Sequence, residues 1–299
     1  MKILLALGGN ALLPPSGTDF NAYHATVKAT ASSIAKLVKA GHKVAITHGN
    51  GPQVGNRLLQ QESCNETPRL PLDVLGAETQ GQIGYMLQRE LRNALPSKET
   101  ISIVTQVVVD VKDPAFSNPT KPVGPFYDVP PGRPGWTVRK IGQRWHRVVP
   151  SPSPMDIVEK KSITDAYERS ALVIACGGGG VPVVRRSGRL EGVEGVIDKD
   201  LAGALLASVL KADLFLILTD VDGVHLSHGK PSQKLLSHLS LKEAKILLDG
   251  TELAEGSMRP KVQAAMHFVS GGRGRKAVIA SLKDMKKAME GKAGTVFVR

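Results

Sequence analysis

Three glycine-rich loops are the segments of this sequence with the clearest potential for chemistry. They read GGNA (8–11), HGNGPQVG (48–55) and CGGGGVPVV (176–184), and each follows a short apolar run. Glycine lets a backbone approach an anion closely and turn its N–H groups toward it. A tight turn would explain one such loop. Three loops at one edge of a sheet instead favour facing cradles for a phosphate and a second anion.

Lysines in distinctive local settings could supply charge to such cradles. Lys199 stands between Asp198 and Asp200 in VIDKDLAG, Lys261 occurs in GSMRPK, and Lys121 lies in NPTKPVGPF. A single lysine is most often a solvated surface residue. The two aspartates that flank Lys199 instead suggest an ionic network that fixes its ammonium group. The four consecutive glycines have no Gly-Lys-Ser or Gly-Lys-Thr after them, which excludes a P-loop.

The elements that must position these residues alternate between strands and helices. A helix with Val27, Ala31, Ile34 and Val38 on one face ends before Gly41. Alternation of this kind predicts a mainly parallel sheet covered on both faces, with ligands beyond the carboxyl ends of its strands. The other expected elements are strands at 3–7, 43–48, 101–109, 171–176, 214–219, 276–280 and 295–298, and helices at about 74–95, 198–211, 240–250 (with a capping box of Ser240 and Glu243) and 258–270.

The middle of the chain has a different character. It holds ten prolines between residues 113 and 154, which exclude a regular helix or a central strand. A disordered linker is one reading, but such linkers normally hold fewer large apolar side chains than this segment, which contains Trp136 and Trp145. We expect a small ordered lid at about 113–156 between two lobes.

Composition places the chain among ordinary globular proteins. It has 299 residues, of which 41% are hydrophobic and 22% are charged, and no apolar run is long enough to span a membrane. The apolar start MKILLAL is interpreted as a buried strand rather than a signal peptide. Cys64 and Cys176 give no disulfide framework, and Cys176 is expected to act as a small buried hydrophobe. These features predict a cytoplasmic protein without membrane association.

The net charge of +12 is the least explained feature. Residues 271–299 carry eight Lys or Arg and two acids. A solvated basic surface is one interpretation, and a nucleic-acid-binding or regulatory protein is the alternative from a different functional class. Aromatic residues make up only 4% of the chain, so stacking platforms for single strands are scarce. We therefore expect no nucleic-acid partner.

The order of several long motifs closely resembles that of carbamate kinases of the amino acid kinase superfamily, over nearly the whole chain. The resemblance implies a single domain over 1–299 that forms a three-layer αβα sandwich around an open, mostly parallel eight-stranded sheet with a small protruding subdomain. It also implies a homodimer. The motifs are LALGGNA, HGNGPQVGN, TQVVVD followed by DPAF and NPTKP, GPFY, RVVPSP, CGGGGVPVV, VIDKD and GSMRPK.

The implied reaction transfers a phosphoryl group reversibly between ATP and carbamate, giving ADP and carbamoyl phosphate. In relatives it often runs toward ATP in arginine fermentation. Residues 1–170, which include the lid, would form the carbamate-binding lobe, and 171–299 the nucleotide-binding lobe. Mg²⁺ would bridge the phosphates, held mostly by the nucleotide and water.

The resemblance assigns the glycine loops to the reacting groups, with no need for a Walker lysine. The adenosine would lie near the strand end at Thr219, Asp220 and Val221. The transferring phosphoryl group would be held by Gly8, Gly9 and Asn10. The carbamate carboxylate would be held by Gly49, Asn50 and Gly51. The nucleotide phosphates would be held by Gly177 and Gly178.

The lysines then take defined roles in an in-line transfer, which needs positioning and charge neutralisation more than covalent chemistry. Lys199 and Lys121 would neutralise charge on the transferring group, and Lys261 would contact the ATP phosphates. Asp200 would orient the lysines.

Some segments depart from the pattern of this family. The first strand, LLALGG, lacks the lysine that many superfamily members carry there, which favours carbamate kinase over acetylglutamate kinase. The lid reads DVPPGRPG where relatives usually carry a short acidic helix, and GQRWHRVVPSP where they usually carry GRGWRRVVPSP. Another small-acid kinase of the superfamily, or a weakly active paralogue, is therefore the alternative within this class.

Overall fold

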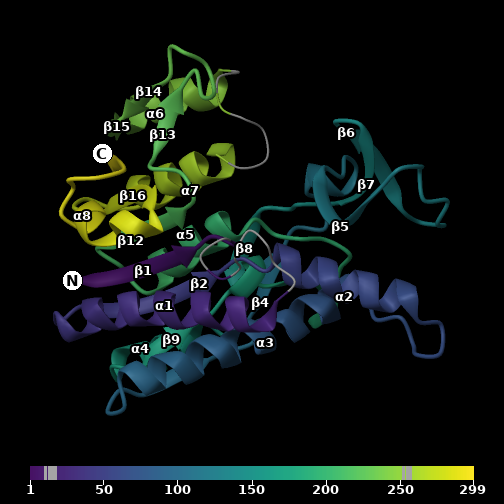
Figure 1. The fold of residues 1–299 in the computed structure, drawn as a ribbon, viewed down its shortest axis with the longest axis horizontal. Coiled ribbons are helices and arrows are strands. Elements are labelled where there is room, and N and C mark those ends of the chain that lie inside the picture. The colour runs from purple at the N-terminus through teal and green to yellow at the C-terminus, as the bar shows by residue number, and fades with distance from the viewer. Residues whose placement is uncertain (10–11, 13–18, 251–252, 254–257) are drawn as a thin grey trace.

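The computed structural model describes residues 1–9, 12, 19–250, 253 and 258–299. Helices cover both faces of a large central sheet, and a separate small sheet protrudes at the upper right of Figure 1. The α-helices are α1 (Phe20–Lys39), α2 (Gly51–Ser63), α3 (Leu72–Ala94), α4 (Lys160–Glu168), α5 (Lys199–Val209), α6 (Leu241–Asp249), α7 (Met258–Ser270) and α8 (Met285–Met289), and the 3₁₀ turns are η2 (Pro114–Phe116), η3 (Gly177–Gly179) and η4 (Leu282–Asp284).

The central sheet has eight strands in the order β15-β17-β16-β12-β1-β2-β9-β3. All neighbouring strands run parallel except β16 and β17. This confirms the predicted open, mostly parallel eight-stranded sheet. Its strands are β1 (Lys2–Leu7), β2 (Lys43–His48), β3 (Thr100–Ser102), β9 (Leu172–Ile174), β12 (Leu214–Thr219), β15 (His238–Ser240), β16 (Lys276–Ser281) and β17 (Thr295–Val298).

The core divides into two apolar layers, one on each face of this sheet. Alternate residues of β1 supply both, because successive side chains of a strand point to opposite faces. Ile3 and Leu5 pack with α1, α3 and α8, whereas Leu4 and Ala6 pack with α4, α5 and α7. The three-layer sandwich follows directly from this alternation of fully buried positions.

Smaller sheets surround the central one. The lid holds an antiparallel sheet in the order β5-β7-β6, which confirms that the proline-rich segment is ordered. A four-stranded sheet has the order β11-β10-β4-β8, and β13 pairs with β14. These strands are β4 (Gln106–Val109), β5 (Lys121–Tyr127), β6 (Thr137–Ile141), β7 (Arg144–Val149), β8 (Pro154–Ile157), β10 (Val181–Arg186), β11 (Arg189–Gly192), β13 (Val224–Leu226) and β14 (Lys234–Leu236).

The single strand predicted at 101–109 is wrong. The segment forms β3 in the central sheet and β4 in the four-stranded sheet, with a break at Thr105. The side chain of Gln80 accepts from the N–H of Thr105 (2.8 Å) and donates to its carbonyl (3.1 Å), which also accepts from the N–H of Val181 (2.8 Å), so the amide takes the N–H that a continuous ladder would use. This distant partner on α3 leaves no trace in the local β propensity.

Other expected elements agree with the structure to within a few residues. The capping box of Ser240 and Glu243 is present, and Gly41 follows α1 with φ 84°. Cys176 is buried as expected, just after β9 rather than within it. Among the described residues, no helix is both long enough and apolar enough to cross a membrane.

Candidate active site

The three glycine-rich loops meet where the carboxyl ends of β1, β2 and β9 reach one edge of the central sheet. Gly8 follows β1, and its N–H donates to the carbonyl of Leu218 at the end of β12 (2.9 Å). The N–H of Gly49, which follows β2, donates to the carbonyl of Leu7 (3.0 Å). The predicted edge therefore gathers loops that lie up to 170 residues apart in the sequence, from Gly8 to Gly178.

A cavity of about 590 Å³ opens between these loops and the lid. This volume lies in the range of small-molecule sites, about 300–1,000 Å³. We call it the cleft. The predicted site residues that line it are Gly9, Gly49, Asn50, Gly51, Lys121, Gly178, Lys199, Asp200 and Lys261.

The cleft contains two buried carboxylates that hold three lysines. Asp200 is 1% exposed and contacts the ammonium groups of both Lys199 and Lys261, the latter at 3.3 Å. Asp198 accepts from Lys121 at 2.8 Å and, as the N-cap of α5, from the N–H of Asp200 at 2.9 Å. Each ammonium group is thus aimed into the cleft by a fixed carboxylate.

Lysines keep Asp198 ionised in spite of its burial. Burial by itself would raise the pKa of this carboxyl. The neighbouring ammonium groups of Lys121 and Lys199 outweigh that effect and hold the pKa of Asp198 below its usual value. A charged Asp198 can therefore fix Lys121 of the lid against the base of the cleft.

The glycines at 177 and 178 stand where side chains have no room. Gly178 has φ 66°, and a Cβ there would lie 2.1 Å from Nδ2 of Asn50. A Cβ on Gly177 would lie 2.4 Å from Nε2 of His48. Gly177 and Gly178 therefore pack their backbone directly against the HGNG loop, which explains why neither carries a side chain.

Asn50 joins the HGNG loop to a helix, His48 bonds within the loop, and Gly49 lies against Lys199. Asn50 is 8% exposed and donates through Nδ2 to the hydroxyl of Thr79 on α3 (2.9 Å). The fully buried His48 donates from Nδ1 to the carbonyl of Gly49 (3.0 Å). A Cβ on Gly49 would lie 3.3 Å from Cδ of Lys199, so the lysine side chain runs across this loop.

The motifs that form this site extend over most of the chain and have counterparts in known proteins. The model of the amino acid kinase family matches residues 1–281. The chain belongs to the amino acid kinase family. Within this family it is 48% identical to the carbamate kinase of Thermococcus kodakarensis, over all of this chain and 99% of that protein.

Two further members of the family bear on the interpretation. A carbamate kinase-like protein of Escherichia coli is 44% identical, over 99% of this chain and 98% of that protein. The carbamate kinase of Giardia lamblia, solved with AMP-PNP, is 41% identical and superposes with a TM-score of 0.91 over 99% of this chain and 98% of that chain.

Several predicted residues of the family pattern lie beside the cleft rather than in its lining. Gly8 and the buried Gly177 are not among the lining residues. Thr219 ends β12 on the same edge, Asp220 and Val221 follow it, and the Thr219 hydroxyl donates to the Asp220 carboxylate (2.9 Å). Asn10 lies outside the described residues.

Sequence reasoning missed the separate roles of the two aspartates and the contribution of His48 and His146. It treated Asp198 as a partner of Lys199, whereas its closest ion pair is with Lys121. His146, in the lid segment that departs from relatives, lines the cleft and donates from Nε2 to the carbonyl of Gly124 (3.0 Å). His48 begins the HGNG motif that the sequence analysis singled out, and its place in that motif could have identified it as a residue of the site.

A valine at Gly178 is expected to remove measurable ADP binding. Its Cβ would collide with the Asn50 side chain, and a β-branched residue is strained at positive φ. Calorimetric titration with ADP tests this, with circular dichroism to confirm folding. Gly188→Val, also at positive φ (79°) but in open space on the β10–β11 turn, is the matched control. Unchanged ADP affinity in Gly178→Val would refute the cradle at this position.

His48 should make stability depend on pH. Burial, aided by Lys199, lowers the pKa of His48 to about 4. The unfolded chain then binds a proton near its ordinary pKa of about 6.5 while the folded chain does not, so stability falls as pH drops from about 6.5 toward 4. Between pH 7 and pH 5 the wild type should lose about 2 kcal/mol more than His48→Gln. Urea unfolding at both pH values measures the difference, and equal losses would contradict it.

Proposed function

We propose that this protein is a carbamate kinase, which transfers a phosphoryl group reversibly between ATP and carbamate to give ADP and carbamoyl phosphate. The observation that carries the proposal is the cleft, where Lys121, Lys199 and Lys261 converge on two glycine loops. Similarity to carbamate kinases over the full chain supports it.

The side chains of the cleft suit an in-line transfer. Lys199 and Lys121 would face the equatorial oxygens of the transferring group, where negative charge must be neutralised. Asp200 holds Lys199 and Lys261 in place, and Asp198 holds Lys121, so little reorganisation is needed as the charge develops. The lysines thus supply a preorganised positive field instead of a covalent intermediate.

We assign one wall of the cleft to carbamate and the other wall to the nucleotide. The Gly49–Gly51 turn and the lid, within the proposed lobe 1–170, would bind carbamate. Gly177, Gly178 and Lys261, with Thr219 to Val221 beyond them, would bind the nucleotide in the lobe 171–299. Gly8, Gly9 and Asn10 would hold the phosphoryl group between the two. The convergence of the loops at one sheet edge supports this division.

Mg²⁺ is proposed to enter with the nucleotide. The carboxylates of Asp198 and Asp200 accept from lysines, and the described residues contain no group of three His, Cys, Asp or Glu arranged to hold a metal ion. This donor set fits a Mg²⁺ held mostly by phosphate oxygens and water. When bound, the ion would neutralise part of the phosphate charge.

A coupled assay run in both directions tests the activity. ADP formation is measured with carbamate, acetylglutamate and acetate as acceptors, and ATP formation with carbamoyl phosphate and ADP. Turnover with carbamate alone is the expected result. Preference for another acid would favour a different small-acid kinase, and turnover near background in both directions would favour a weakly active paralogue, as the similarity to the carbamate kinase-like protein of Escherichia coli allows. Steeply salt-dependent binding to duplex DNA would instead support the nucleic-acid alternative.

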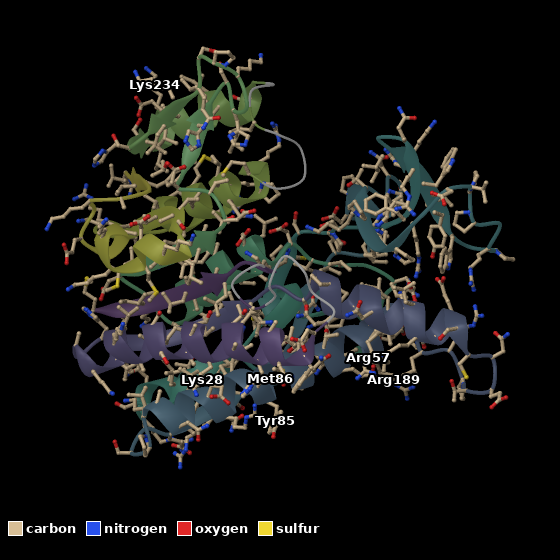
Figure 2. All side chains as sticks on the ribbon, viewed as in Figure 1. Lys28, Arg57, Tyr85, Met86, Arg189 and Lys234 are labelled. Atoms are coloured by element: carbon tan, nitrogen blue, oxygen red, sulfur yellow. The ribbon has the colours of Figure 1, made fainter. Side chains whose placement is uncertain are left out.

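We also propose a cytoplasmic homodimer that acts in arginine metabolism, as the resemblance implies. Exposed aromatic side chains on neighbouring helices support an interface: Phe20 of α1 is 63% exposed and Tyr85 of α3 is 61% exposed. Tyr85 is labelled at the lower surface of the molecule in Figure 2. Light scattering tests the assembly, and a monomer mass at micromolar concentration would overturn it.

A further inference from the structure

We propose that a second cavity, at the opposite edge of the central sheet, binds a small organic anion with an apolar body. This cavity of about 540 Å³ is nearly as large as the cleft. We call it the amino-end pocket. It lies between the last turns of α1, the residue that precedes β2, and the η4–α8 segment, at the left of Figure 1.

The amino-end pocket is separate from the cleft. It is lined at the amino ends of β1 and β2, by Met1 and His42, whereas the glycine loops follow the carboxyl ends of the same parallel strands. Six residues of β1 span about 20 Å at 3.3 Å per residue. A ligand in this pocket would therefore not contact the cleft.

Charge is the first argument for an anionic ligand. Lys36, Lys283 and Lys286 line the pocket, and the acid that faces them is Glu290. Glu290 is engaged by Lys292 at 2.8 Å, with a weaker attraction to Lys286. Among the described residues, no carboxylate forms an ion pair with Lys36 or Lys283. The pocket therefore keeps an excess of positive charge that only a ligand or solvent can balance.

An orphaned nitrogen is the second argument. Nδ1 of His42, a residue that lines the pocket, is shielded from solvent and has no hydrogen-bond partner among the described residues. A buried polar atom without a partner destabilises the fold, so such atoms are rare and each calls for an explanation, a bound molecule among them. A turn of the imidazole ring would bring Nδ1–H to the pocket, where a carboxylate or other oxyanion would supply the missing acceptor.

The floor of the pocket defines the remainder of the ligand. Leu37 and Met285 are 6% and 5% exposed, and Leu282 and Met289 are partly buried around them. Methionine side chains adapt to ligands of varied shape. An apolar floor with lysines at the rim fits a molecule that has one apolar body and one anionic head, and not a bare inorganic anion.

Fluorescence titration with 8-anilinonaphthalene-1-sulfonate tests the pocket, because this probe has an apolar body and a sulfonate. Saturating ADP and Mg²⁺ keep the probe out of the cleft. One saturable site per chain is expected. Charge reversal in Lys36→Glu/Lys283→Glu should lower the affinity for the probe about tenfold. Ser33→Trp, which fills the pocket from α1, should abolish probe binding.

The matched control is Lys28→Glu/Lys287→Glu, which changes the net charge equally at positions on α1 and α8 that do not line the pocket. Lys28 is labelled on α1 in Figure 2. The affinity of this control variant for the probe should stay within about twofold of the wild-type value. Equal weakening in both double variants, or full binding in Ser33→Trp, would overturn the site. If the charge-reversed variant does not fold, Lys36→Gln/Lys283→Gln gives the same comparison with a smaller change.

Competition then tests the ligand class. Benzoate should displace the probe, whereas benzyl alcohol and inorganic phosphate should not. Equal displacement by benzyl alcohol would refute the need for an anionic head, and equal displacement by phosphate would refute the need for an apolar body. None of these measurements uses the kinase reaction, so failure of the pocket and failure of the proposed function are distinguishable.

Discussion

Replacement of Lys199 by alanine is expected to lower kcat at least about 100-fold, because loss of one preorganised charge stabiliser typically costs about 3–4 kcal/mol in the transition state. Lys199 is fixed in position by its surroundings in the structure. It contacts the buried Asp200, runs across the Gly49 turn and lines the cleft. Steady-state kinetics with ATP and carbamate measures the change.

The nucleotide affinity of Lys199→Ala should change much less than kcat, since Lys261 remains beside Asp200 at 3.3 Å. The same contact keeps one partner for the buried carboxylate, and a thermal melt checks that the variant is folded. Lys276→Ala, an exposed lysine at the start of β16, is the control. A near-normal kcat in Lys199→Ala would eliminate the role assigned to this lysine.

The features of the site that sequence could predict are those encoded locally. An apolar run followed by glycines marks a strand end, and parallel strands bring such ends to one edge, so the meeting of the loops at Gly8, Gly49 and Gly178 was predictable. The positive φ of Gly178, 66°, was likewise foreseeable from the glycine itself. Helix limits followed from apolar periodicity and from caps such as Ser240 with Glu243.

The features that sequence could not predict depend on partners distant along the chain. Thr105 divides the expected strand because Gln80, 25 residues away, takes its backbone N–H. Asp198 and Asp200 are two positions apart, yet one pairs with Lys121 and the other with Lys199 and Lys261. That division depends on the start of α5: Asp198 is its N-cap while Asp200 lies within its first turn. No local pattern encodes which lysine reaches which carboxylate.

The lid contacts the body of the protein through its own ion pairs as well as through Lys121. Arg147 of β7 donates to Glu194 at 2.7 Å, and the Tyr127 hydroxyl contacts Glu62 of α2 at 2.9 Å. The Arg147 guanidinium lies over the Trp136 ring, with Cζ 4.4 Å from the centre of the ring. Tyr127 belongs to the GPFY motif and Arg147 to the RVVPSP motif, so the lid docks near the cleft through residues that the family pattern includes.

Replacement of Lys121 by alanine tests whether this docking serves catalysis. Lys121 begins β5 and reaches Asp198 at 2.8 Å across 77 residues of sequence. Its ammonium group enters the cleft only as part of the lid, so its loss should remove charge stabilisation from the transition state and leave the nucleotide wall intact. We expect kcat to fall about 100-fold, with the ADP dissociation constant within about threefold of the wild type.

Two further variants distinguish catalysis from lid stability. Lys121→Arg should recover only part of the activity, because the planar guanidinium places its charge differently beside Asp198. Lys140→Ala removes an exposed lysine from β6 of the same lid and should leave kcat unchanged. If Lys121→Ala retains the wild-type kcat and carbamate KM, Lys121 is a solvated lid residue whose contact with Asp198 does not serve the reaction. If kcat falls while ADP binding persists, the lid delivers its charge to the carbamate side of the cleft.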